Sequence, residues 1–217
     1  MKKGIRYLIF LVGLFLNSIG VSLATRANLG TSPISSLPYV ASLCFAPSLG
    51  VFTVVLSVIL VLLQIVILGQ KFQIEHLLQL PISVLFGYFI DLTMKWLDFF
   101  DPQALPLQLA ALLLSCAVLG FGVYLETIAD VAMLPGESFV RAVCQRWGTD
   151  FGHTKIGFDC SITVSAGLCS LLFFGRLNGV GIGTILSALL VGWFVRRYRA
   201  IAQFFSAQAV QEEQQVI

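Results

Sequence analysis

The chain has 217 residues, of which 58% are hydrophobic and only 11% are charged, and its formal net charge is +2. Soluble domains carry about 25% charged residues, so this composition excludes an ordinary soluble domain and favours a protein embedded in a lipid bilayer. A hydrocarbon core of about 30 Å requires roughly 20 apolar residues per helix. Six segments meet this requirement and are expected to span the membrane: 7–24, 51–69, 77–94, 105–125, 156–174 and 179–195.

The first segment follows three basic residues, as the apolar part of a signal peptide would. Such a part has about 7–15 residues and is followed by small residues at the cleavage site. The segment 7–24 is longer than this, and residues 24–26 (Ala-Thr-Arg) fit a cleavage site poorly. We therefore interpret it as a retained membrane span.

The apolar segment 33–45 and the amphipathic segment 135–147 are too short to cross a bilayer as helices. Ser32 is a favourable N-cap for the first, and Pro33 suits its first helical position. The second begins in the same way, at Pro135. We expect both to be re-entrant or to lie at the membrane surface. If both crossed fully, the chain would have eight spans and parallel repeats.

The two halves of the chain resemble each other. A long span, a short proline-started helix, a span, a tight turn and a span occur twice, and residues 85–89 (LFGYF) match residues 190–194 (LVGWF). Three spans per unit is an odd number, so the second unit enters from the opposite side, as in many transporters. The predicted fold is an all-α polytopic membrane protein with two three-helix inverted repeats, 1–99 and 100–199, and a cytoplasmic tail, 200–217.

The basic residues give the orientation. With the N-terminus in the cytoplasm, ten lysines and arginines lie inside: Lys2, Lys3, Arg6, Lys71, Arg141, Arg146, Lys155, Arg196, Arg197 and Arg199. Three lie outside: Arg26, Lys95 and Arg176. Cytoplasmic loops carry the excess of Lys and Arg, so both termini are predicted to be cytoplasmic.

Four motifs resemble the YczE/YyaS/YitT group of bacterial integral membrane proteins: NLGTSPISSLP (28–38), LPGESFVRAVCQRWG (134–148), HTKIGFD (153–159) and GVGIGTILSALLVG (179–192). The resemblance extends over nearly the whole chain. It implies a multi-pass protein of the bacterial cytoplasmic (inner) membrane, in a group whose function is mostly unassigned. Some members are associated with regulators that bind a pyridoxal cofactor, and this association implies a vitamin-like or amine cargo.

Acidic residues at membrane depth are the strongest functional candidates, because a charge there costs roughly 2.5–3.5 kcal/mol on insertion scales. Asp159 follows Lys155 by four residues, so the two share a helix face. They form either a local ion pair or a site for a proton or a substrate amine. Asp91, near the outer end of the third span, either reaches lipid headgroups, pairs with Lys95 or contributes to a substrate site.

Glu137 lies at the start of the second short helix, where exposed N–H groups attract anions. It either caps this helix or faces a cavity, where an acid beside amide donors would suit a zwitterion or an amine. We expect Glu126, Glu137 and Asp159 to line one inward-facing acidic cavity. In the alternative, Lys155 and Arg141 neutralise these acids and the cluster is purely structural.

Four more polar residues are candidates for substrate binding: Asn17, Arg26, Thr31 and Ser32. Gln64, like Asn17, is either polar glue between helices or part of a cavity wall. The small residues Gly179, Gly183 and Ser187 have the spacing of a close helix-packing stripe. His153 has no second ligand near it in the sequence, so an interfacial position is favoured over metal binding.

The sequence lacks the patterns of several other chemistries. Its five cysteines have neither CxxC nor metal-ligand spacing and are interpreted as small apolar residues. We find no nucleophile–base pair and no phosphate-binding loop. An enzyme, a cofactor, a metal site and a nucleic-acid partner are therefore not expected.

The favoured function is a small-molecule transporter or facilitator for an amine, a zwitterion or a vitamin-like compound, with its site at the interface of the two repeats. A variant is the substrate-binding subunit of a vitamin uptake complex, because the chain has a suitable size and Gly20 and Ala24 form a small-residue pair. The alternative is a non-transporting membrane scaffold that assists a partner enzyme. The expected partners are the lipid bilayer, an unidentified small molecule, and either a second copy of the chain or a partner membrane protein.

Overall fold

The chain folds almost entirely into helix. The computed structural model describes the backbone of residues 3–215 and the side chains of all of these except 74, 75 and 204–215. Helix makes up 82% of the chain, and no strand occurs among the described residues, which confirms the predicted all-helical class. The elements are α1 Lys3–Arg26, α2 Pro33–Cys44, α3 Leu49–Leu68, the 3₁₀ turns η1 Gly69–Lys71 and η2 Ile74–Leu78, α4 Gln79–Trp96, α5 Leu105–Ala129, α6 Pro135–Trp147, α7 Phe151–Phe174 and α8 Ile182–Gln215.

Five helices within the described residues, α1, α3, α4, α5 and α7, are long and apolar enough to cross a membrane. The segment predicted as a sixth span, 179–195, is different. Its helix α8 begins only at Ile182, and the first of three arginines follows at Arg196. The 14 uncharged residues 182–195 extend about 21 Å as a helix, short of a 30 Å core. The sixth span stays a prediction. Residues 200–215, expected to be a separate tail, continue α8.

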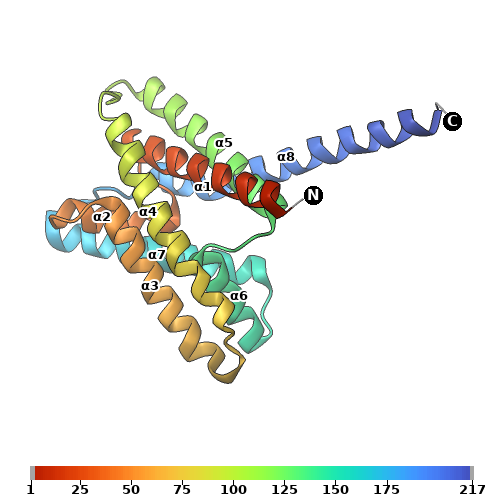
Figure 1. Cartoon of the computed structure of the whole chain (residues 1–217). Coiled ribbons are helices and arrows are strands. Elements are labelled where there is room, and N and C mark those ends of the chain that lie inside the picture. Colours follow the sequence, from red (N-terminus) through yellow and green to blue (C-terminus); the bar gives the residue numbers. More distant parts are fainter. Residues whose placement is uncertain (1–2, 216–217) are drawn as a thin grey trace.

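Helices α1 and α5 run antiparallel as the central pair of the fold (Figure 1). Arg6, near the start of α1, donates a hydrogen bond from Nε to the carbonyl oxygen of Ala129 at the end of α5, over 2.8 Å. In the middle, Gly20 lies so close to Leu119 that a methyl group in its place would overlap that side chain. Gly20 and the fully buried Ala24 are therefore used inside the fold.

The two short helices pack against long helices of the opposite halves, α2 on α7 and α6 on α3. They coincide closely with the segments 33–45 and 135–147. Their first turns touch, because a methyl group in place of Gly136 would overlap the side chain of Ile34. From this meeting point the helices diverge. Helix α2 ends beside the end of α7, where the rings of Phe45 and Phe173 are 5.5 Å apart, whereas α6 ends next to the start of α7.

A buried amide pair anchors the start of α6. The side chain of Gln64, on α3, is 1% exposed and exchanges hydrogen bonds with Gln79 at the start of α4. Its Nε2 also lies 3.3 Å from the carbonyl oxygen of Pro135 and donates to it. Gln64 is therefore polar glue between helices, one of the two roles expected for it.

The remaining long helices complete the bundle. Helix α4 packs on α1 and α3, and α8 packs on α5 before leaving the bundle on the side where the N-terminus lies (Figure 1). Helices α3 and α4 touch through Gly50 and Gly87, where a methyl group at position 50 would overlap the carbonyl oxygen of Gly87.

Candidate functional site

A cavity of about 410 Å³ lies where the first turns of α2 and α6 meet, and all eight α-helices contribute to its wall. This volume is within the range of small-molecule sites, about 300–1,000 Å³. Most of the wall is apolar. The polar or charged residues on it are Asn17, Ser32, Ser35, Thr53, Ser57, Glu137, Lys155, Asp159 and Ser187. We call this space the central cavity.

An ion pair lies on the α7 wall of the central cavity. Lys155 Nζ donates to Asp159 Oδ1 at 2.5 Å, and the two side chains are 28% and 21% exposed. This is the pair expected from their spacing. However, α7 begins at Phe151 instead of residue 156. At 1.5 Å per residue, Asp159 therefore lies about 12 Å into the helix, deeper than the 5 Å expected from the sequence.

Glu137, on α6, lines the central cavity within the range of the charges of this ion pair. Burial raises the pKa of its carboxyl group above the ordinary value, and the nearby Asp159 acts in the same direction. The positive charges of Lys155 and Arg141 lower the pKa and oppose these effects. The local charge balance therefore depends on what occupies the cavity.

The predicted capping role of Glu137 is wrong. The N-cap of α6 is Leu134, and no side chain makes a capping hydrogen bond there. A capping box requires Ser or Thr at that position, which Leu134 does not supply. The Glu137 carboxyl group is therefore left to face the central cavity.

The start of α2 is built as predicted, with Ser32 at the N-cap and Pro33 as the first helical residue. The Ser32 hydroxyl does not cap the backbone, however. Its Oγ donates to Ser35 Oγ over 2.9 Å. The first N–H groups of a helix have no partner within it, and the first turns of α2 and α6, which contain Ile34 and Gly136, are part of the cavity wall.

Asn17 lines the central cavity and is hydrogen-bonded to Glu126, which does not. Its side chain is 3% exposed, and its Nδ2 donates to Glu126 Oε1 over 2.7 Å. Its Oδ1 has no hydrogen-bond partner among the described residues. Glu126 itself does not line the cavity. The expected group of three acids is therefore two cavity acids, Glu137 and Asp159, and a third that reaches the cavity only through Asn17.

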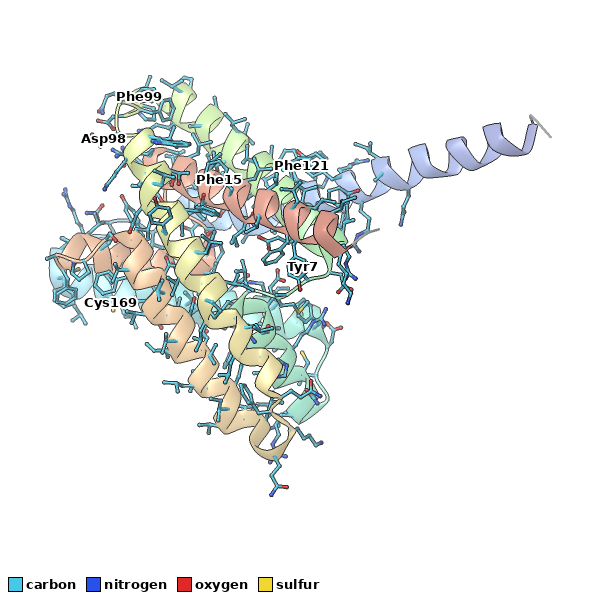
Figure 2. The ribbon with its side chains drawn as sticks, viewed as in Figure 1. Tyr7, Phe15, Asp98, Phe99, Phe121 and Cys169 are labelled. Carbon is cyan, nitrogen blue, oxygen red and sulfur yellow. The ribbon has the colours of Figure 1, made fainter. Side chains whose placement is uncertain are left out.

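Arg26 and Asp91 lie in a second hollow of about 920 Å³ at the end of α1. Arg26 Nη2 is 2.6 Å from Asp98 Oδ1, and Figure 2 shows Asp98 at the far end of α1 from Tyr7. Asp91 accepts hydrogen bonds from Ser48 Oγ at 2.6 Å and from the Gly50 backbone N–H at 2.9 Å. Asp91 therefore anchors the start of α3, a role that the sequence analysis did not anticipate.

The two spaces have no lining residue in common. Between them lies a hydrophobic cluster, which we call the septum. It consists of Val21, Leu49, Ile90 and Leu119, with Tyr39, Phe86, Met94 and Val191 packed against it. Leu49, Tyr39 and Met94 also face the second hollow, whereas Val21, Leu119, Phe86 and Val191 face the central cavity. The septum is thus the shared wall of the two spaces.

The remaining predicted features lie near the start of α8. Thr31 is fully buried and bonds through its backbone N–H to the Gly179 carbonyl at 3.4 Å, away from the cavity. Gly179 precedes α8, so the proposed stripe of Gly179, Gly183 and Ser187 on one helix is wrong. Gly183 instead donates its N–H to the carbonyl of Leu29 at 2.8 Å, a close approach to a loop.

Asp150 caps the start of α7. Its Oδ1 accepts a hydrogen bond from the His153 backbone N–H at 3.0 Å and lies 2.9 Å from the His153 ring Nδ1. These contacts hold the pKa of Asp150 below its ordinary value of 3.8, and the hydrogen bond from the His153 backbone N–H has the largest effect. His153 is therefore exposed at a helix start, as an interfacial residue would be.

We expect Asp150→Ala to lower the melting temperature of the purified protein at pH 7. Because the folded-state pKa of Asp150 is depressed, its contribution to stability is present above about pH 4 and is lost as pH falls through the folded-state value. The difference in melting temperature between the two proteins should therefore become smaller as the pH falls from 7 to 3. A difference that stays constant over this range would contradict a charge-dependent cap.

The apolar wall and the glycines of the site were not predicted from the sequence. Gly192, on α8, lines the central cavity, and a methyl group in its place would contact nothing within 4 Å. In the sequence, Gly192 stands out only through the match of residues 190–194 to residues 85–89, in which it takes the position of Gly87. Periodicity alone does not separate a residue that faces a cavity from one that faces lipid.

Comparisons with known proteins give one match. Residues 4–200 match a family described as a family of unknown function, DUF6198. No curated protein and no solved structure matches the chain significantly. The relation to the YczE/YyaS/YitT group stays a prediction, since the matching family is not described by those names. Within the described side chains, no group of three or more His, Cys, Asp or Glu is placed to hold a metal ion.

Proposed function

The chain belongs to the DUF6198 family, whose function is unknown, and we propose that it transports or facilitates the passage of a small organic molecule across the bacterial cytoplasmic membrane. The observation that carries the proposal is the central cavity. It lies among all eight helices, and the starts of α2 and α6 and the Lys155–Asp159 pair are on its wall. Transporters place their sites in this way, where interrupted helices meet between two halves.

The helix contacts support the predicted inverted repeat. If α1–α4 correspond to α5–α8, the packing of α1 on α4 matches that of α5 on α8, and α2 on α7 matches α6 on α3. The antiparallel α1 and α5 are then related to each other, as a two-fold axis in the membrane plane requires. Two contacts are exceptions within the described residues: α7 has no packing on α8 comparable to that of α3 on α4, and α6 has none on α4 comparable to that of α2 on α8.

The proposed topology places both chain termini in the cytoplasm. A green fluorescent protein fused after Ala200 should therefore fluoresce in cells, because this reporter folds in the cytoplasm. Alkaline phosphatase fused at Asp101, in the loop between α4 and α5, should be active, because this reporter requires the periplasm. Phosphatase activity after Ala200, or its absence at Asp101 in a well-expressed fusion, would contradict this orientation.

A library of labelled metabolites tests the proposed substrate site directly. A ligand that binds only the folded state raises the melting temperature, so at least one compound should stabilise the purified protein and enter proteoliposomes that contain it. Gly192→Phe should abolish both effects, because position 192 opens onto the cavity. Gly157→Phe is the matched control, since position 157 is equally open but lies outside the cavity wall.

Two results would contradict the proposal. One is a library without any stabilising compound, which would favour the alternative of an accessory membrane protein. The other is a ligand whose binding and uptake are reduced equally by Gly192→Phe and Gly157→Phe.

A further inference from the structure

We propose that the central cavity binds a small zwitterion, an α-amino acid or a close analogue with an apolar side chain. The carboxylate would lie between the starts of α2 and α6, and the ammonium group on the carboxylates of Glu137 and Asp159. This inference rests on the proposed role of the cavity as the substrate site and specifies the chemical class of the substrate.

The two helix starts form the anion-binding part of the site. Both begin with proline, and their first turns meet at Ile34 and Gly136. Glycine permits this approach, since a side chain at position 136 would overlap Ile34. Each start carries unused N–H donors and the positive end of a helix dipole. Two such ends that converge on one cavity favour an anionic group between them.

The cation-binding part of the site is independent of these donors. Glu137 and Asp159 approach from α6 and α7, and only Asp159 has a cationic partner within ion-pair distance, Lys155. Asn17 Oδ1 is not part of this site, because it lies against the backbone of Gly122 on α5. An ammonium group, with three donors, would pair with the two carboxylates.

The position of Glu137 limits the distance between the ligand charges. This residue belongs to the first turn of α6, so its backbone N–H is an unused donor while its side chain is an acceptor in the same cavity. A ligand that contacts both must carry its opposite charges a few bonds apart, as an α-amino acid does. A simple anion would meet the Glu137 carboxylate, and a simple amine would leave the helix donors unused.

The rest of the wall fits an apolar side chain. Leu56 and Leu60 on α3, Phe86 on α4 and Val123 on α5 also line the cavity. The volume of about 410 Å³ accommodates an amino acid with a branched or aromatic side chain and excludes much larger compounds.

The common amino acids, tested by thermal shift and by isothermal calorimetry on the purified full chain, are the probes. For each amino acid that binds, the amine without its carboxylate and the acid without its amino group are compared; for phenylalanine these are phenethylamine and 3-phenylpropanoate. We expect each single-charge analogue to bind at least about tenfold more weakly, since it leaves buried polar groups unpaired. Glu137→Gln should weaken the binding of the amino acid at least tenfold and should not weaken the binding of 3-phenylpropanoate.

Arg146→Gln, in the last turn of the same helix, is the control and should bind as the wild type does. An amine or an acid that binds as tightly as its parent amino acid would overturn the zwitterion proposal. So would a set of ligands from the metabolite library that contains no amino acid. In both cases, loss of those ligands in Gly192→Phe would leave the proposed transport function standing, so the two proposals fail separately.

Discussion

Replacing Gly50 with leucine is expected to abolish folding in the membrane, and Gly50→Ala should lower the free energy of unfolding by at least about 1–3 kcal/mol. A methyl group at position 50 would overlap the Gly87 carbonyl oxygen, which belongs to the backbone of α4 and cannot rotate away. Helices α3 and α4 would have to separate. The separation would also break the hydrogen bond from the Gly50 N–H to Asp91.

Yield after membrane extraction and melting temperature in detergent measure this effect. Gly157→Ala and Gly157→Leu are the matched controls, because position 157 lies within the long helix α7 and has open space around it. Equal melting temperatures for Gly50→Ala and Gly157→Ala would show that the α3–α4 contact is looser than the structure indicates.

Lys155→Met is expected to produce the largest loss of stability among the cavity variants, because it leaves the Asp159 carboxylate without its cation. Breaking a fully buried pair costs about 3–5 kcal/mol. The side chains here are 28% and 21% exposed, so we expect roughly 1–3 kcal/mol. The double variant Lys155→Met/Asp159→Asn should recover most of this stability, since no unpaired charge remains. A double-mutant cycle of melting temperatures measures the coupling.

The same double variant separates the two interpretations of this ion pair. If the pair contributes to the substrate site, the stable double variant should bind and transport no ligand that the wild type accepts. If the pair only eases membrane insertion, the double variant should transport normally. Normal uptake and unchanged pH dependence in both Glu137→Gln and Asp159→Asn would likewise show that these acids are structural.

The sequence predicted the helices well because their determinants are local. Pro33 and Pro135 each mark the first residue of a short helix, and segment length separated these helices from the long ones. The Lys155–Asp159 pair was predicted for the same reason, since four residues on one helix fix its geometry.

Features that depend on tertiary contacts were not predictable in this way. Asp91 bonds to Ser48 and Gly50, which lie on a different helix, and not to the nearby Lys95 that the sequence offered. The start of α8 was misplaced because the segment before it packs against Leu29 through backbone contacts. The central cavity itself was invisible, since Leu, Val and Phe occur equally on walls that face lipid and on walls that face a ligand.

The septum also has an electrical consequence. If the chain transports as proposed and the two spaces open to opposite sides of the membrane, the poorly polarisable part of the barrier is reduced to this one layer, and most of the membrane voltage should fall across the eight side chains that form it. A single charge that crosses this layer exchanges about 2.3 kcal/mol with the field per 100 mV. A zwitterion has no net charge and exchanges none. The uptake of a zwitterion that moves alone should therefore not respond to an imposed voltage. A current that accompanies the uptake would give the number of ions or protons that move with each ligand.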